Sequence, residues 1–483
     1  MKKLLFTAIV LFAAGALYSA SAQEEAAEAT VPAEPEKEMK TGWSFGVLPT
    51  ATFSADNGFQ AGAFGDVYYY GDGKTYPDPL HKISWEASYF TKSHRMRLYL
   101  AYDSKYLIPG MRLNASVTYM NDPLYSFWGF NGPASFDSGV PASFTSVDYA
   151  LWGNRSFNPN INYYGMSRQM LRVLANVQGR ITDNLNWAAG VNFWNWNLGE
   201  MKDPAVDANG DGNKTNYDHN LTLFNKYKDL GAIKAEEAAG GMSLELNAGF
   251  VFDTRDIEAA PNRGIWAEAY LNGAPYSGNP ETGLYSPYLK ACVYFRHYID
   301  IPIHLPAGDP VFAYRLAWQQ TILGETPVYM IQNNPLLVQR NMISEGFGSS
   351  NTIRGLRENR VLAEGMAWAN TELRVKIVNF KLFNQYFYLA TNPFFDAGII
   401  TKPYRADVLN KVIDDSALAT INGYEGGTTI YNPDKVKELI YSAGLGLKLA
   451  MNQNFIISAE LAKCFTPGLD AGLWIGIGIN YQF

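Results

Sequence analysis

The chain has 483 residues, of which 46 are acidic and 39 are lysine or arginine, giving a formal net charge of −7 at pH 7. This acidic balance argues against nucleic acid as a partner, because a surface that binds phosphates carries an excess of cations. The two cysteines, Cys292 and Cys464, lie in predicted strands far apart in order, so a disulfide framework is not expected.

Residues 1–22 have the pattern of a secretory signal peptide. Two lysines precede an apolar run that ends at Tyr18, and Ala20-Ser21-Ala22 forms a cleavage site of the A-x-A kind. Residues 23–42 are rich in Glu, Ala, Pro and Lys and have almost nothing to bury, which predicts a flexible acidic linker. The chain is therefore expected to be exported, with its folded domain over residues 43–483.

From about residue 44 onward, apolar and polar residues alternate with the period of two that marks β-strands. In the last segment, Leu473, Ile475 and Ile477 share one face, whereas Trp474 and Gly476 share the other. Most segments are about ten residues long, near the length that a tilted strand needs to cross a bilayer. About sixteen strands are predicted, at 44–53, 58–70, 82–92, 95–104, 111–120, 166–180, 185–198, 241–253, 264–272, 287–299, 310–322, 364–377, 386–397, 440–451, 454–463 and 472–483.

Two architectures have strands with one apolar and one polar face, a soluble sandwich and a transmembrane barrel. The long connections all follow odd-numbered strands, which matches long outer loops and short periplasmic turns and has no reason in a sandwich. Closure also leaves no strand edge unpaired in lipid. The sequence therefore predicts an all-β fold, an antiparallel transmembrane β-barrel of about 16 strands with long extracellular loops, in the outer membrane of a Gram-negative bacterium. The long connections are 121–165, 199–240, 323–363 and 398–439.

Residues 207–218, with the sequence DANGDGNKTNYD, have the spacing of a calcium-binding loop. Asp207, Asn209 and Asp211 are the candidate oxygen ligands, with Asp218 at the twelfth position. The alternative is a polar outer-loop turn, since Asn, Asp and Gly are the residues that turns prefer. A structural Ca²⁺ in this loop is the one cofactor that the sequence suggests, and otherwise none is expected.

The sequence gives little support to catalysis. No G-x-S-x-G motif occurs, and the five histidines have no metal-ligand spacing. An outer-membrane hydrolase could still assemble its catalytic side chains from separate strands. We expect a protein that is not an enzyme.

Five segments of the second half carry a resemblance to a known family. They are FDTRDIEAAPNRG (252–264), TIRGLRENR (352–360), NTELRVKI (370–377), FFDAG (394–398) and SAGLGLKL (442–449). In this order and strand context they resemble the BamA/TamA-type outer-membrane assembly barrels. These belong to the bacterial surface antigen superfamily and are related to the translocators of two-partner secretion.

In that family, the sixth outer loop folds back into the barrel lumen, and carboxylates of the following two strands hold its R-G-[FY] tip. The matching residues here are Arg354-Gly355-Leu356 at the tip, with Glu372 and Asp396 on the wall. Both acids lie on the polar, lumen-facing side of their predicted strands. A guanidinium can engage a carboxylate through two parallel hydrogen bonds. The loop is either an anchor that sets how the barrel opens or a plug that keeps its shape.

Two other arginines of the loop, Arg357 and Arg360, could pair with Glu358, Glu364 or other wall acids, and the sequence leaves this choice open.

The resemblance also implies a function at the contact between the first and last strands. In the family, parting of these strands admits client polypeptide. Gly476 and Gly478 of the last strand add no cross-strand contacts, which predicts weak pairing there, although such glycines can also reflect close packing in the lumen. Phe483 matches the C-terminal signal of outer-membrane barrels.

The family usually carries periplasmic POTRA domains, which the segment 23–42 cannot form. From the resemblance we expect a role in assembly, insertion or translocation of proteins at the outer membrane, as part of a complex. The partners of this protein would be outer-membrane lipid, client polypeptides and other outer-membrane or periplasmic subunits. The alternative is a passive pore or structural barrel.

Overall fold

The structure is a computed structural model that describes residues 40–54, 56–76, 78–135, 164–201, 222–257, 260–333, 346–348, 351–382, 385–411, 431–451, 455–469 and 472–479. The predicted signal peptide (1–22), residues 23–39 of the predicted linker and the predicted calcium loop (207–218) lie outside the described residues, and so does Phe483.

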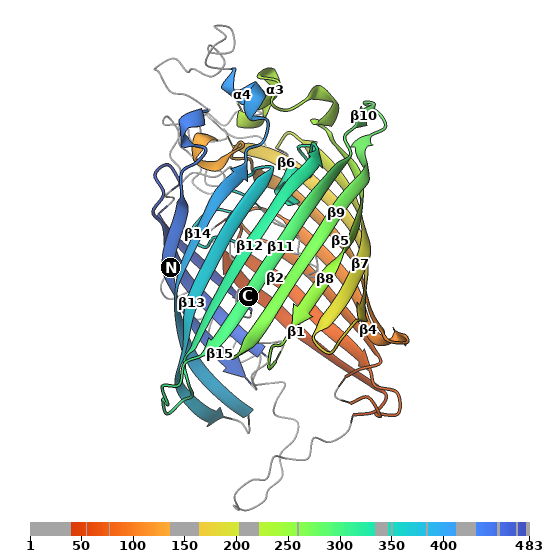
Figure 1. Cartoon of the computed structure of the whole chain (residues 1–483), viewed down its shortest axis with the longest axis vertical. Coiled ribbons are helices and arrows are strands. Elements are labelled where there is room, and N and C mark those ends of the chain that lie inside the picture. The colour runs from red at the N-terminus through yellow and green to blue at the C-terminus, as the bar shows by residue number, and fades with distance from the viewer. Residues whose placement is uncertain are drawn as a thin grey trace, which may run out of the picture.

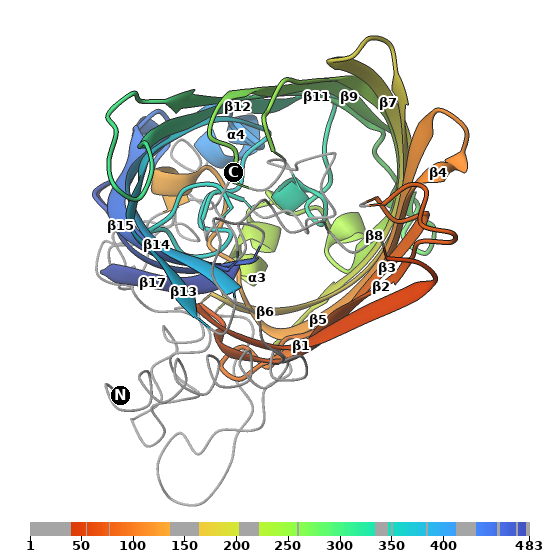
Figure 2. The same ribbon diagram turned by 90° about the horizontal axis from the view of Figure 1, so that it is seen from below.

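Sixteen long strands in the described parts of the chain form one closed antiparallel sheet (Figures 1 and 2). Each strand pairs with the next along the chain, and β1 pairs with β17 to close the ring. The additional strand β10 is two residues long and extends the hairpin of β9. The predicted antiparallel β-barrel of about 16 strands is confirmed. The strands are β1 (Trp43–Ser54), β2 (Gly58–Tyr69), β3 (His81–Phe90), β4 (Met96–Ile108), β5 (Met111–Ser126), β6 (Gly165–Arg180), β7 (Leu185–Gly199), β8 (Gly240–Asp253), β9 (Gly264–Asn279), β10 (Leu284–Tyr285), β11 (Tyr288–Asp300), β12 (Val311–Gly324), β13 (Gly365–Leu382), β14 (Gln385–Lys402), β15 (Ile440–Met451), β16 (Phe455–Cys464) and β17 (Leu473–Ile479).

The two faces of the wall carry different side chains. Leu246 and Leu316 are exposed on the outer face, whereas their neighbours Glu245 and Arg315 are buried on the inner face. Successive side chains of a strand point to opposite faces, so the alternation in the sequence becomes an apolar outside and a polar inside. No helix in the described ranges is long and apolar enough to cross a membrane.

Several strands are longer than predicted. β5 continues past the predicted end at residue 120 to Ser126, and its ladder with β6 shifts register around Pro123. β9 continues past residue 272 to Asn279, and the ladder with β8 shifts where Pro275 lies. A β-bulge takes residues out of the hydrogen-bonded ladder, so it tolerates a proline without ending the strand.

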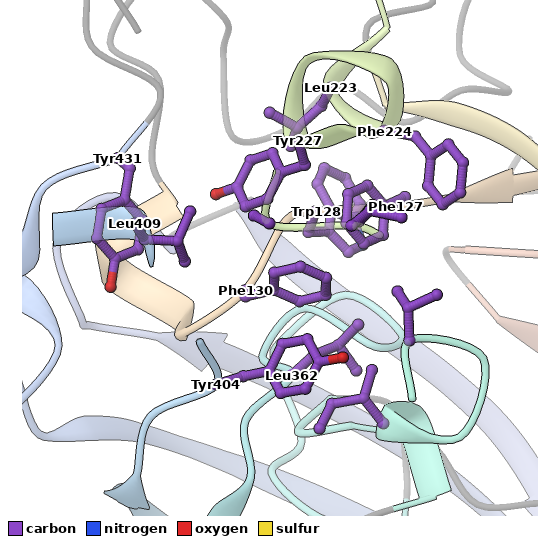
Figure 3. Packing of buried hydrophobic residues seen from close by; sticks show 14 of the residues in the cluster. Phe127, Trp128, Phe130, Leu223, Phe224, Tyr227, Leu362, Tyr404, Leu409 and Tyr431 are labelled. Carbon is purple, nitrogen blue, oxygen red and sulfur yellow. The ribbon is translucent and has the colours of Figure 1, made fainter. Parts of the chain in front are cut away.

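At one end of the barrel, loops pack into an aromatic cluster that we call the cap (Figure 3). Phe130 lies edge-to-face with Tyr227 and Tyr404, with ring centroids 5.2 and 4.6 Å apart. The cap joins residues of the β5–β6, β7–β8, β12–β13 and β14–β15 connections, whose strands are spread around the ring, so it spans this mouth of the barrel. Its short helices are η1 (Gly132–Ser135), α3 (Leu223–Asp229), η4 (Ala235–Glu237), η5 (Ile331–Asn333), α4 (Ala406–Asn410) and η6 (Pro433–Lys435).

Candidate functional site

The β12–β13 connection folds into the barrel, and Figure 2 shows parts of it inside the ring of strands. We call its residues 346–364 the lumen loop. Phe347 and Val361 pair across its base. At its tip, Gly355 has a φ of +90°, and a Cβ there would lie 3.1 Å from the backbone nitrogen of Cys464 in β16. Glycine is needed at this position both for the backbone conformation and for the close approach.

Arg354 binds Asp396 of β14 through three hydrogen bonds. The guanidinium donates from Nε to Oδ2 and from Nη2 to Oδ1, each at 2.9 Å, and the backbone N–H donates to Oδ2 at 3.0 Å. Both side chains have 0% exposure. The side chain and the backbone of the tip are therefore fixed by one carboxylate, with the two-pronged geometry that only arginine provides.

Two further carboxylates complete the site. Nη1 of Arg354 donates to Glu372 of β13 at 3.2 Å and to Glu460 of β16 at 3.3 Å. Arg374 donates to Glu372 at 2.7 Å, and Lys448 donates to Glu460 at 2.7 Å. The buried cluster thus contains three cations and three anions, so its formal charge is balanced.

The structure brings together Arg354, Glu372 and Asp396, which the family resemblance matched to the loop tip and the wall. Glu460 was not among the predicted site residues. Its only signal is its place on the polar face of β16, which many wall residues share.

A ring contact exists at the tip, although the third tip residue is Leu356. The guanidinium of Arg354 lies over the Phe394 ring, 3.4 Å from its centroid, and Phe394 belongs to β14. Leu356 is fully buried in an apolar cluster with Phe347 and Trp368. The aromatic partner of the arginine therefore comes from the wall and not from the loop.

The partners of the other loop arginines differ from the wall acids considered in the sequence. Nη1 of Arg357 donates to Asp56, in the β1–β2 turn, at 3.4 Å. Nη2 of Arg360 donates to the carbonyl of Gly468, in the β16–β17 turn, at 3.2 Å. Glu364 instead accepts from Lys402 at 3.2 Å.

Glu358 joins a second buried ionic cluster. Its carboxylate accepts from Asn57 at 2.7 Å and from Arg95 at 2.9 and 3.1 Å, and Arg168 lies 3.7 Å away. Asp122 of β5 bridges the same two arginines. Burial alone would raise the pKa of the Glu358 carboxyl, but Arg95 and Arg168, with the hydrogen bonds from Arg95 and Asn57, outweigh it and lower the pKa to about 2.

The contact between β1 and β17, which we call the seam, is short. Among the described residues it has two aligned pairs, Phe53 with Ile477 and Ser54 with Gly476. On its other edge β1 is aligned with β2 over twelve pairs, and β17 is aligned with β16 over seven. The seam is therefore the place where the ring is held by the fewest described backbone pairs.

The two seam glycines have different surroundings. A Cβ at Gly476 would lie 2.3 Å from the Trp474 ring, so this glycine makes room for an indole. A Cβ at Gly478 would meet no atom of the described residues within 4 Å. Close packing therefore accounts for Gly476, whereas no described neighbour restricts the side chain at Gly478.

No protein-family model and no curated protein matches the chain. Among solved structures, the chain is similar to BamA from Haemophilus ducreyi lacking POTRA domains 1–3, with 12% identity and a TM-score of 0.51, over 97% of this chain and 78% of that one. The chain has a BamA-type barrel fold. Also similar are CdiB from Acinetobacter baumannii, with 11% identity and a TM-score of 0.44 over 92% of this chain and 60% of that one, and a bacterial polysaccharide outer membrane secretin, with 9% identity and a TM-score of 0.37 over 92% and 99%.

Within this BamA-type barrel, no group of three or more His, Cys, Asp or Glu side chains in the described residues is arranged to hold a metal ion. The predicted calcium ligands Asp207, Asn209, Asp211 and Asp218 lie outside those residues. The charges of the Arg354 cluster pair with one another.

Proposed function

We propose that this barrel acts at the outer membrane in the assembly, insertion or translocation of proteins. It works as the membrane subunit of a larger complex and has no enzymatic step. The BamA-type fold makes this class of function reasonable, and the seam is the observation that carries the proposal.

The seam offers a place for a client strand. β1 is aligned with β2 from Trp43 to Ser54, but only Phe53 and Ser54 are aligned with described residues of β17. A strand edge with few partners can accept the backbone of another extended chain, which supplies the missing hydrogen bonds. A client segment would thus enter the sheet between β1 and β17.

The cap and the lumen loop weigh against the alternative of a passive pore. The cap packs loops from four connections across one mouth, and the buried Arg354 cluster holds the lumen loop inside the wall. A solute that crosses the barrel would have to pass both. We place the cap at the outer end, because the long connections belong there.

Partner subunits would supply the periplasmic handling of clients. The acidic segment 23–42 offers a flexible connection to such a subunit. Co-purification from native membranes would identify these subunits.

Locking the seam tests the proposal. Phe53 and Ile477 are aligned, so the double variant F53C/I477C places two thiols at a spacing that a disulfide can bridge. In cells that depend on this protein, we expect oxidation of the pair to reduce the folded amount of other outer-membrane proteins, and reduction to restore it.

The matched control is F53C/F59C, which links β1 to β2 across a ladder that stays paired when the seam opens. We expect this variant to behave like the unmodified protein. Normal assembly of other barrels with a fully oxidised seam would overturn the proposal.

A further inference from the structure

Two turns meet at the same end of the seam. The β1–β2 turn follows Ser54, and the β16–β17 turn precedes Leu473, while Ser54 is itself aligned with Gly476. The few backbone pairs of the seam therefore lie close to both turns. The seam itself has only two aligned backbone pairs among the described residues. Any contact that joins the two turns would therefore help to hold β1 against β17.

The lumen loop is attached firmly to the β17 side. Arg354 binds Asp396, Glu372 and Glu460, which belong to β14, β13 and β16. Arg360 adds a hydrogen bond to the β16–β17 turn at Gly468. The tip therefore moves with β13 to β17 as one unit.

The next residues of the same loop reach the β1 side. Arg357 pairs with Asp56 at 3.4 Å, and the backbone N–H of Glu358 donates to Asp56 at 3.1 Å. The Glu358 carboxylate accepts from Asn57 in the same turn and from Arg95, which precedes β4. Glu358 is 8% exposed and Arg95 is 7% exposed, so water screens these contacts little.

We propose that Arg357 and Glu358 form a latch that holds the β1–β2 hairpin against the β16–β17 hairpin and sets how readily the barrel opens at its seam. The Arg354 anchor stays intact when β1 parts from β17, because all its partners lie on one side. The latch contacts must break, together with the two backbone pairs of the seam. Its consequence for clients rests on the function proposed above, whereas the latch itself does not.

The charges explain why Glu358 matters most. Arg95 and Arg168 face Glu358 and Asp122, which gives two cations and two anions. Loss of the Glu358 charge leaves two buried guanidinium groups with one carboxylate. Their repulsion and desolvation then favour an open state in which Arg95 regains water. Glu358 thus acts on the seam by neutralising Arg95 and Arg168 in the closed state.

A distance measurement across the seam tests the latch. Phe59 in β2 and Leu473 in β17 are 39% and 63% exposed on the outer face, so F59C and L473C can carry spin labels in the full chain with Cys292 and Cys464 changed to alanine. Pulsed electron paramagnetic resonance in lipid vesicles then reports the closed and open populations of the seam.

We expect E358Q to raise the longer-distance population about tenfold. This factor corresponds to a destabilisation of the closed state relative to the open state by about 1.4 kcal/mol. The milder variant D56N should act in the same direction, because it removes the charge that faces Arg357 but leaves the Arg95–Asp122 pair intact. The control is E325Q, which removes a carboxylate from the cap and leaves the latch untouched. Heat-modified mobility on gels establishes that each variant is folded.

An E358Q protein with the distance distribution of the unmodified protein would overturn the latch, and if E358Q does not fold, D56N decides in the same way. The two proposals can fail separately. A response to E358Q together with normal client assembly on a locked seam keeps the latch and rejects the assembly function. No response together with failed assembly on a locked seam does the reverse.

Discussion

Arg354 is fully buried, and each nitrogen of its guanidinium donates to a carboxylate. Burying a charge is costly unless hydrogen bonds and opposite charges replace the lost water. Here the replacement comes from three different strands, so one side chain ties β13, β14 and β16 to the loop. A lysine has no planar fork and could not satisfy these acids in the same way.

The variant R354A is expected to lose about 3–5 kcal/mol in its free energy of unfolding, because it leaves Asp396 buried without its main partner. Urea unfolding in lipid vesicles measures this change. R354K should fall between R354A and the unmodified protein.

The matched control is R97A. Arg97 also pairs with a lumen acid, Glu86, but it is 34% exposed in its side chain, so we expect a loss below about 1 kcal/mol. Equal stabilities of R354A and R97A would contradict the assigned importance of the anchor.

Glu358 makes stability depend on pH. Its pKa is lowered from 4.5 to about 2 in the folded protein, so its contribution is fully present above pH 4.5 and is lost as the pH falls toward 2. The free energy of unfolding should therefore exceed that of E358Q at neutral pH, and the difference should shrink over this range. Unfolding of both proteins along a pH series measures it. A difference that stays constant down to pH 2 would show that the charge of Glu358 does not stabilise the fold.

At the scale of secondary-structure elements, the strands build the wall of the barrel and the short helices of the cap cover one mouth. The strands pair with their sequence neighbours, and bulges at Pro123 and Pro275 let the outer ends of β5 and β9 continue beyond a residue that cannot donate to the ladder. The short helices add no spanning element and instead close one mouth. Arg405, next to α4, holds η4 by donating to Glu237 and to the carbonyl of Ala232.

R405A is expected to loosen the cap, because Glu237 has 0% exposure and would lose its cationic partner. Protease added to intact cells should cut the outer loops several-fold faster. A decrease of about 1–2 kcal/mol in the free energy of loop opening raises the population of the cleavable state by about this much. The control K234A removes a pair with Glu325 in which Lys234 is 43% exposed, and it should change little. Equal cleavage rates in both variants would contradict this view of the cap.

The molecule as a whole is a barrel with a loop folded into its interior, an aromatic cap at one mouth and a short seam. These three features act together, because the same connection, β12–β13, contributes Arg354 to the anchor, Glu358 to the latch and Leu362 to the cap. A change in this one loop can therefore reach all three.

The unmodified protein in planar bilayers is expected to show a small conductance, because the cap and the lumen loop obstruct the axis. Removal of residues 346–364 should produce large, steady currents, since the deletion empties the lumen and also takes Leu362 out of the cap. The R97A protein, which keeps the loop, serves as the control. Large currents in the unmodified protein would favour the passive pore.

The candidate site was only partly predictable. Glu372 and Asp396 could be paired with Arg354 because the family resemblance supplied the partners and the strand phase agreed. Glu460 has the same phase, but nothing ranked it above other wall acids. Asp56 lies 301 residues from Arg357 in sequence, in a turn with no distinctive pattern.

The sequence by itself determined the two-faced strands, their number and the side of each long connection, because the alternation of side chains and the length of a crossing strand are local properties. Only the tertiary structure decided which arginine meets which carboxylate, where proline-containing ladders continue, and that one loop touches both sides of the closing strands. Those contacts depend on the register around the whole ring and on the path of a loop through its interior, and neither is written in any short stretch of chain.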